Sequence, residues 1–317
     1  MERNFLESFS KYIKKDDILI LAVSGGVDSM AMVHMILCTH DKEKIIIAHF
    51  DHSLRGDESD GDRIFVENYC RTRGILFVGE KLDISQLARE EKMSIEHAAR
   101  KYRYEFLFRI AREKNAGYLL TAHHSDDRIE TAIFNLIRGS KLAGIHALSG
   151  LEHRAGITLF RPLIGITKAD ILEYAEKHGI EFREDSTNKD TEYQRNHLRI
   201  SVLPEFEKIN PEYRKVISTF IEYTEELKNW IDQEVEKFFG EKSEFSALEF
   251  AHKTSFFQKE AIRYLYEKTH QGTIGLSEGN IDELIRFICT ANGGTEKRIG
   301  KLILKKKTST IYYGVDL

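Results

Sequence analysis

The sequence predicts an α/β fold: a doubly wound parallel sheet followed by a smaller, mainly helical domain that ends in a hairpin. Three observations lead to this prediction. Short apolar runs alternate with helical patterns over the first two-thirds of the 317 residues, as in βα units. The run at 18–23 is apolar throughout, which is typical of a strand buried on both faces. After Pro204 the apolar runs give way to one long, acidic helical pattern.

The other elements of the first domain follow in order along the chain. Strands are predicted for four further short apolar runs, the last of them the weakest: 45–50, 75–78, 118–122 and 158–160. Helices are predicted for the stretches with helical spacing between them: 30–37, 57–73, 94–114 and 126–138. A capping-box pattern at 167–170 opens one more helix, which stops near Gly179. This alternation favours a parallel sheet with helices on its faces.

The second domain is predicted to be helical until its end. A long helix is expected over 211–239, and a further helical region follows it. Two β-like runs within 297–313 flank turn residues at 307–310, which is the pattern of a hairpin. At about 150 residues per domain, the length fits two domains. We place them at 1–207 and 208–317.

Composition excludes several classes of protein. Lysine and arginine number 47 against 51 aspartates and glutamates, so the net charge of −4 excludes a uniformly basic nucleic-acid coat but not a local basic patch. The cysteines Cys38, Cys70 and Cys289 form no CxxC pair, which argues against a disulfide framework or a zinc ribbon and favours a reducing compartment. The sequence shows neither a signal peptide nor a run of 18 apolar residues, so we expect a cytoplasmic protein without a membrane span.

A glycine-rich segment follows the first strand directly and opens a helix. Its residues are Ser24, Gly25, Gly26, Val27, Asp28 and Ser29. The glycines let the backbone turn sharply and approach a ligand closely, and the N–H groups at the helix start attract an anion such as phosphate. The serines add hydroxyl donors, and the carboxylate of Asp28 is suited to hold Mg²⁺ against phosphates. The alternative is a glycine-rich turn with a purely structural role.

A second polar segment, 121–131, follows the fourth strand. Asp127 and Glu130 are three residues apart and share one face of the predicted helix, while His123 lies at the carboxyl end of the strand. Two carboxylates on one face suit Mg²⁺ or a cationic ammonium group. If the first and fourth strands are neighbours, both segments line one cleft at the carboxyl edge of the sheet. Helix capping with a solvated acidic face is the alternative, and a zinc site built from neighbouring histidines is a weaker one.

Two arginine pairs have the spacing of one helix face. Arg100 and Arg103 lie in the helix predicted over 94–114, and Arg195 and Arg199 lie four residues apart further along the chain. Arginines near phosphates would neutralise developing negative charge, and the second pair would reach a nucleotide phosphate or base. A solvated amphipathic helix is the plain alternative.

The motif SGGVDS at 24–29 resembles the pyrophosphate-binding loop of the PP-loop ATP pyrophosphatases. This resemblance implies a HUP-type sheet and cleavage of ATP to AMP and pyrophosphate. With HFDHSLR, EHAARKYRYEF, TAHHSDDRIET, RPL at 161–163 and EDSTN…RNHLR…LP, the chain resembles the tRNA(Ile)-lysidine synthetases over roughly residues 18–204. The whole set is specific, whereas amidotransferases, ligases and tRNA thiolases share the first motif. The stretch after it fits a short form of the family.

The family resemblance implies a two-step ligation. ATP adenylates O2 of the wobble cytidine of a tRNA(Ile) with a CAU anticodon and releases pyrophosphate. The ε-amine of free L-lysine then attacks C2 and expels AMP, which gives lysidine. Carried over to this sequence, residues 24–29 bind the ATP phosphates, and Asp28 places Mg²⁺.

The resemblance also implies roles for the remaining polar side chains. Asp127 and Glu130 hold the lysine with His123 close by, and Arg103 and Arg199 grip the target nucleotide and the developing charge. The catalytic candidates are therefore Asp28, Arg103, His123, Asp127, Glu130 and Arg199. A carboxylate or a histidine would deprotonate the lysine amine, and the sequence does not decide between them.

A basic stretch near the end offers a second contact with tRNA. Six basic residues and no acid fall within 297–307, which fits contact to phosphates. A lysine-protected edge strand explains the same residues equally well. The predicted tRNA contacts are Arg195, Arg199, Lys301, Lys305, Lys306 and Lys307.

Three other functions fit part of the pattern. A PP-loop tRNA 2-thiolation enzyme shares the first motif, but it typically needs a catalytic cysteine or a cysteine-held cluster, and no cysteine here lies in a motif loop. A non-catalytic adenine-nucleotide-binding protein would need the phosphate loop alone. A small-molecule amidating ligase would turn over ATP without tRNA. The oligomeric state, a homodimer included, is left open.

Overall fold

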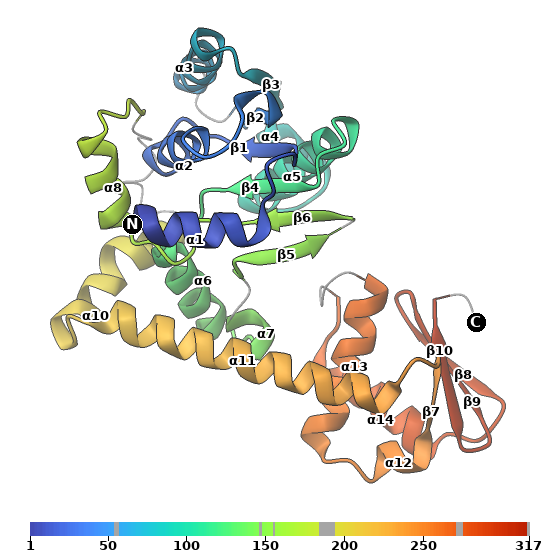
Figure 1. Ribbon diagram of the computed structural model, residues 1–317. Helices are drawn as coiled ribbons and strands as arrows, with labels where there is room; N and C mark the ends of the chain where they lie inside the picture. Colours follow the sequence, from blue (N-terminus) through green and yellow to red (C-terminus); the bar gives the residue numbers. More distant parts are fainter. Residues whose placement is uncertain (54–56, 146–147, 155, 184–193, 271–274, 316–317) are drawn as a thin grey trace. The chain divides into compact units, whose positions relative to one another are not determined.

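A computed structural model describes residues 1–53, 57–145, 148–154, 156–183, 194–270 and 275–315 (Figure 1). The chain divides into two compact units, Met1–Glu222 and Tyr223–Leu317. The division falls inside one long helix, later in the chain than the predicted 207/208. The assignment of a catalytic part to 1–207 and a tRNA-contacting part to 208–317 stays a prediction.

The later division has a physical reason in the long helix, α11 (Tyr213–Phe239). Its first turns pack on unit 1, because Tyr213 and Ile221 are buried in one apolar cluster with Ile129 of α6 and Leu198. Burial of such side chains contributes about 1.5–3 kcal/mol each. Composition changes near Pro204, but tertiary packing continues beyond that point.

Unit 1 is built on a six-stranded sheet. Its strands are β1 (Leu19–Ala22), β2 (Ile45–Asp51), β3 (Leu76–Lys81), β4 (Tyr118–Thr121), β5 (Leu151–Arg154) and β6 (Ile157–Phe160). The order is β3-β2-β1-β4-β6-β5, and all neighbours are parallel except β5 with β6. The predicted doubly wound parallel sheet is confirmed. Strand β5 is absent from the prediction because three of its four residues are polar, so it shows no apolar run.

Helices cover both faces of this sheet (Figure 1). The covering helices are α1 (Glu2–Tyr12), α2 (Val27–Leu37), α3 (Asp57–Arg73), α4 (Ile84–Glu90), α5 (Ile95–Glu113) and α8 (Lys168–Lys177). The other helices of unit 1 are α6 (Ser125–Ile137), α7 (Leu142–Ile145), α9 (Gln194–His197) and α10 (Leu203–Ile209). Leu19 and Leu21 of β1 share a buried cluster with α1, α2, α3 and α8, whereas Ile20 shares one with α4 and α5. This alternation explains why the first apolar run has no polar face.

Unit 2 combines helices with a four-stranded antiparallel sheet. After α11 come β7 (Glu244–Ser246), α12 (Ala247–Ala251), α13 (Ser255–His270), α14 (Glu278–Thr290), β8 (Thr295–Ile299), β9 (Leu302–Lys307) and β10 (Thr310–Gly314). The strand order is β7-β10-β9-β8. The predicted hairpin is formed by β9 and β10, with its turn at Thr308 and Ser309. β7 and β8 extend it on either side.

The long helices of the chain are amphipathic rather than uniformly apolar. In α11 the buried Ile221, Ile231 and Val235 alternate with charged residues. Among the described residues, no helix combines the length and the apolar character that crossing a bilayer requires.

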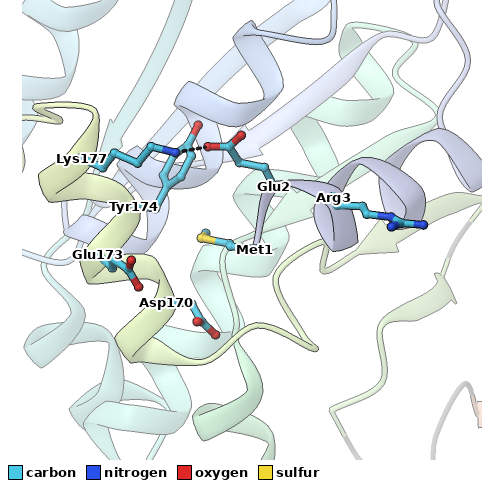
Figure 2. Close-up of a pocket in the computed structure, with 7 residues that line it drawn as sticks. All are labelled: Met1, Glu2, Arg3, Asp170, Glu173, Tyr174 and Lys177. Atoms are coloured by element: carbon cyan, nitrogen blue, oxygen red, sulfur yellow. Dashed lines mark hydrogen bonds and ion pairs between the residues drawn. The ribbon is translucent and has the colours of Figure 1, made fainter.

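A hollow of about 320 Å³ lies between α1 and α8 (Figure 2). Its acidic lining residues are Glu2, Asp170 and Glu173, and Lys177 Nζ pairs with Glu2 Oε1 at 3.4 Å. Arg3 also lines the hollow, so its acidic and basic side chains nearly balance and create no field that attracts a triphosphate. None of the predicted site residues lines this hollow, so it does not suit the nucleotide.

Candidate functional site

The carboxyl ends of β1 and β4 bring the two predicted motifs to one edge of the sheet. The strands are parallel neighbours, with Ala22 beside Thr121, and β2 lies on the other side of β1. Ligands of open α/β sheets bind at such a switch in strand order. The loop after β1 and the segment after β4 meet where Asp28 Oδ1 lies 3.9 Å from His124 Nε2. The expected shared edge is confirmed.

The phosphate loop, Ser24–Ser29, is held by its own hydroxyl groups. Ser24 Oγ accepts a hydrogen bond from Gly26 N at 3.3 Å. Ser29 Oγ accepts one from Gly25 N at 3.3 Å and donates to Gly26 O at 2.9 Å. Because α2 begins at Val27, the loop N–H groups gather at a helix start, where the helix dipole adds positive potential. Such an arrangement binds anions, above all phosphate.

Gly25 has a backbone conformation that other residues rarely adopt, with a φ of +96°. A Cβ at this position would make ordinary contact with Val66 Cγ2 of α3 at 3.4 Å, so the positive φ, not a lack of space, requires glycine. On its other side, Gly25 O accepts a hydrogen bond from Arg183 N at 3.0 Å. The Arg183 guanidinium binds Asp62 of α3 at 2.5 Å. The loop is thus fixed between α3 and the segment that follows α8.

Asp28, the predicted Mg²⁺ ligand, is paired with a lysine that the sequence does not single out. Lys168 Nζ donates to Asp28 Oδ1 at 2.6 Å. Lys168 is the first residue of α8, and the predicted capping box sets it there: Asp170 N donates to Thr167 Oγ1 at 3.1 Å, and Thr167 N donates to Asp170 Oδ2 at 3.2 Å. The capping-box pattern in the sequence predicts where α8 begins, but it does not predict that the start of α8 lies beside the phosphate loop.

His124 joins the two halves of the site, and the sequence does not single it out either. Its buried ring lies among three carboxylates, at 3.9 Å from Asp28, 3.6 Å from Asp126 and 3.5 Å from Asp127. Within the residues that the structure describes, its Nδ1 has no hydrogen-bond partner. The adjacent pair of histidines in the motif gives no sign of which one faces the loop.

Asp126 connects the site to its supporting helices. Its Oδ2 accepts a hydrogen bond from Lys168 N at 2.9 Å, and its Oδ1 accepts one from Arg214 Nε of α11 at 3.0 Å. Ser125 N adds a bond to Ile166 O at 2.9 Å. These contacts fasten the start of α6 to the start of α8.

The predicted lysine-binding carboxylates face an arginine of the same chain. Arg199 binds Glu130 through two hydrogen bonds, Nε to Oε1 at 2.6 Å and Nη2 to Oε2 at 2.8 Å, and its Nη2 lies 3.5 Å from Asp127 Oδ1. Burial raises the pKa of Glu130, and the Arg199 guanidinium opposes that rise. The hydrogen bond to Glu130 raises the pKa of Arg199. This carboxylate pair therefore binds a cationic nitrogen, here an internal one.

His123 lies in a basic environment rather than beside the carboxylates. Burial, followed by Arg103, Arg161 and Arg100, lowers the pKa of His123 well below its ordinary value, so the imidazole is neutral at pH 7. Arg103 and Arg100 lie over the Tyr104 ring at 5.4 and 5.1 Å. Arg161, from the RPL motif, is only 1% exposed. Arg161 already pairs with Glu152 Oε2 at 3.2 Å. The positive charges of Arg100 and Arg103 favour an anionic group beside the neutral histidine.

Other motif residues are only partly covered by the structure. Arg195 lies in α9, while Arg199 follows in a helical turn at Leu198–Val202. The EDSTN motif at 184–188 and residues 54–56, which include the arginine of HFDHSLR, lie outside the described residues.

Lys306 does not fit the predicted contact with tRNA. It is 7% exposed, and its Nζ donates to Ile288 O of α14 at 2.7 Å, so it stabilises the fold of unit 2. The edge-strand interpretation is also wrong for it, because β9 lies between β10 and β8. The sequence alone does not show which of three consecutive lysines is buried and bonded to a backbone carbonyl.

The other predicted lysines of unit 2 are accessible. Lys301 is exposed at the turn between β8 and β9. Lys305 Nζ lies 3.5 Å from Glu296 Oε2, and Lys307 Nζ lies 5.2 Å from the centre of the Tyr312 ring. These contacts are at the surface, where ion pairs are weak enough to exchange for a phosphate.

The cysteines lie in other parts of the fold than the motif loops. Cys38 directly follows α2, Cys70 is buried in α3, and Cys289 lies in α14 of unit 2. Burial raises the pKa of Cys70 to about 12, which makes it a poor nucleophile. Across the described part of the chain, no three histidine, cysteine or acidic side chains are arranged to hold a metal ion. Neither the thiolation nor the zinc interpretation gains support here.

Comparison with known proteins decides the family. Residues 1–206 match the family model of the PP-loop domain, which binds ATP. The tRNA(Ile)-lysidine synthase of Petrotoga mobilis is 32% identical over 305 residues, which cover 95% of this chain and 94% of that protein. The chain belongs to the tRNA(Ile)-lysidine synthase family.

Members of the tRNA(Ile)-lysidine synthase family differ in length. The bifunctional protein TilS/HprT of Listeria monocytogenes is 38% identical over 216 residues, which cover 68% of this chain but 33% of that protein. The matched part thus spans about a third of that relative. Among solved structures, the U34-tRNA thiolase NcsA from Methanococcus maripaludis is similar, with a TM-score of 0.59 and 20% identity over 71% of this chain and 76% of that one. At this identity the similarity shows the PP-loop fold alone.

Proposed function

We propose that the protein uses ATP to ligate L-lysine to C2 of the wobble cytidine of a tRNA(Ile) with a CAU anticodon. One observation carries this proposal: the phosphate loop and the acidic face of α6 share one sheet edge, with Asp28 and Asp127 at 3.9 and 3.5 Å from His124. Family membership supports the substrate class, since the Petrotoga relative is named for this reaction.

The first step is adenylation of the cytidine. Its O2 attacks the α-phosphate of ATP, and pyrophosphate leaves. The N–H groups of the phosphate loop and the dipole of α2 stabilise the charge of the triphosphate and of the leaving group. Asp28 fits a magnesium site of the kind that needs one carboxylate, because Mg²⁺ usually completes its shell with water and phosphate oxygens. When bound there, Mg²⁺ would neutralise charge on the phosphates.

The second step is attack by lysine. Its ε-amine forms the C–N bond to C2 and gives up a proton to a carboxylate or histidine of the site, while AMP departs with the former O2. The attacking amine must be neutral, so the cation held by Glu130 and Asp127 is the α-ammonium group of lysine. Neutral His123 and the neighbouring Arg103 form the basic side of the site, which suits the phosphate of the adenylate.

Contacts with tRNA extend beyond the reacting nucleotide. We infer that Arg195 and Arg199 bind tRNA in unit 1 and that Lys301, Lys305 and Lys307 bind its phosphates in unit 2. The reaction draws on tRNA, ATP and free lysine, so we also propose a cytoplasmic location.

The test is transfer of label. The protein is incubated with ATP, labelled lysine and tRNA(Ile) carrying a CAU anticodon, and the wobble nucleotide is analysed. Label in that nucleotide, lost with Asp28→Ala and with a tRNA whose wobble base is uridine, is the expected result. ATP turnover in the absence of tRNA, without label transfer, would instead indicate a small-molecule ligase.

A further inference from the structure

We propose that Lys168 is a phosphate-binding residue that exchanges partners: it neutralises Asp28 in the nucleotide-free protein and binds the β- and γ-phosphates of ATP once the metal takes Asp28. The inference rests on the proposed ATP-dependent activity of this same sheet edge. It concerns a side chain to which neither motif assigns a role.

The contact itself is a short ion pair at the phosphate loop. Lys168 Nζ lies 2.6 Å from Asp28 Oδ1. The two side chains are 37% and 30% exposed, so water reaches both. A pair this accessible contributes about 0–1 kcal/mol and breaks readily when a stronger partner arrives. Such a pair is poorly suited to holding the fold together and well suited to exchange.

The backbone of Lys168 is fixed although its ammonium group is not. Its N–H donates to Asp126 Oδ2 at 2.9 Å, and Asp126 is in turn bound by Arg214. The capping box of Thr167 and Asp170 closes on the adjacent residues. The backbone of Lys168 is therefore held in place next to the phosphate loop, while its four-carbon side chain can rotate. This combination is expected for a residue whose ammonium group changes its partner when a ligand binds.

Charge balance explains the direction of the exchange. Without nucleotide, Lys168 neutralises Asp28, so a divalent cation alone gains little by binding there. ATP arrives with four negative charges and its own metal, and the metal is a stronger partner for the carboxylate than an ammonium group. The released Nζ then faces phosphate oxygens, for which lysine is a common ligand as a point charge. ATP and metal are thus expected to bind together.

This exchange predicts opposite effects of one substitution on two ligands. Lys168→Ala removes a phosphate ligand, so MgATP binds at least about 10-fold more weakly, equivalent to about 1.4 kcal/mol. The same change frees Asp28, so Mn²⁺, used as a probe for Mg²⁺, binds the nucleotide-free protein more tightly. A residue with a merely structural contribution would weaken both ligands.

The experiment measures binding by calorimetry for MgATP and AMP and by electron paramagnetic resonance for Mn²⁺. We expect Lys168→Ala to weaken MgATP, leave AMP within about twofold and tighten Mn²⁺, and Lys168→Arg to keep most of the MgATP affinity. Lys177→Ala, on the same helix, is the matched control and should match the wild type.

Two results would overturn the inference. Either MgATP binds Lys168→Ala as it binds the wild type, or AMP and MgATP weaken equally. Both leave the proposed function intact, because the wild type still binds ATP. If the wild type itself fails to bind MgATP, the proposed function fails and this inference falls with it.

Discussion

The phosphate loop and the acidic half of the site are formed by different kinds of chemical groups. The phosphate loop is made of backbone N–H groups, two glycines and two hydroxyl groups, all from residues 24–29. The acidic half is made of the side chains of Asp127 and Glu130, and its arrangement depends on Arg199, which lies 69 residues after Glu130 in the chain. The backbone donors and hydroxyl groups of the first half lie within one loop, and only its carboxylate, Asp28, is paired with a distant residue, Lys168. In the second half, the carboxylate Glu130 is bound by the distant Arg199.

The two halves of the site therefore differ in what a ligand must displace when it binds. In the phosphate loop, the N–H groups of Gly25 and Gly26 donate only to hydroxyl groups of the same loop, at 3.3 Å, which is long for a hydrogen bond and exchanges readily for an anion. The acidic half already holds a cation, so an incoming ammonium group must displace the Arg199 guanidinium. The two halves should therefore respond differently to substitution. Changes in the phosphate loop should abolish both steps of the reaction, whereas changes in the acidic half should weaken or alter the binding of lysine.

Breaking the loop should have the largest effect. Gly25→Val forces a branched side chain into a positive φ of +96° and toward Val66, so we expect tRNA-dependent AMP release to fall by more than about 100-fold. Gly117→Ala, where a Cβ would meet nothing within 4 Å, is the control. Unaltered AMP release by the valine variant with native thermal stability would show that the loop does not bind the phosphates.

Removing one charge from the acidic half should affect only the second step. Glu130→Gln removes a charged partner of the lysine ammonium, so the lysine KM should rise about 10- to 100-fold, while pyrophosphate release from ATP and tRNA continues. Glu222→Gln, on the solvent side of α11, is the matched control. Equal loss of both steps would contradict a separate lysine site.

The internal cation should shape the pH dependence of lysine binding. Burial raises the pKa of Glu130 and Arg199 lowers it. Acidification protonates Glu130 and so weakens the binding of lysine. The higher the pKa of Glu130, the higher the pH at which lysine affinity begins to fall. Arg199→Met should therefore move the loss of lysine affinity to higher pH, yet tighten lysine above that range and lower kcat. A shift toward lower pH would refute competition between Arg199 and the substrate.

The basic strand of unit 2 should give the smallest effect. Lys305→Glu combined with Lys307→Glu should weaken tRNA binding several-fold and lower the salt slope by about 0.7–0.9 for each phosphate that the variant no longer neutralises. Lys15→Glu with Lys114→Glu, at the opposite, amino edge of the first sheet, is the charge-matched control. Identical slopes for both double variants would leave unit 2 without a contact to tRNA phosphates.

Features that depend on neighbouring residues in the chain can be predicted from this sequence, whereas features that depend on distant residues cannot. Apolar runs such as 18–23 locate strands buried on two faces, and SGGVDS defines its own turn, so the sheet and the phosphate loop are predictable from local sequence. The β5 strand has no apolar run to reveal it. Lys168 and Arg199 are ordinary helix residues locally, and only tertiary packing brings them to Asp28 and Glu130.

Lys306 illustrates the same limit in unit 2. In the sequence it is one of three adjacent lysines. Side chains alternate between the two sides of β9, so that of these three lysines only Lys306 is buried. Its identity as a surface or core residue depends on strand register, which charge patterning does not show.

Nucleotide activation and lysine transfer are proposed to occur one after the other at the edge of the sheet where β1 and β4 end. A single-turnover measurement with the wild type, ATP and tRNA(Ile), first without lysine and then with it, separates the two steps. We predict one pyrophosphate per tRNA before lysine is added, and release of AMP only afterwards, in equal amount to the lysine incorporated. AMP released together with pyrophosphate in the absence of lysine would show that no adenylated tRNA accumulates and that the two steps are not separate.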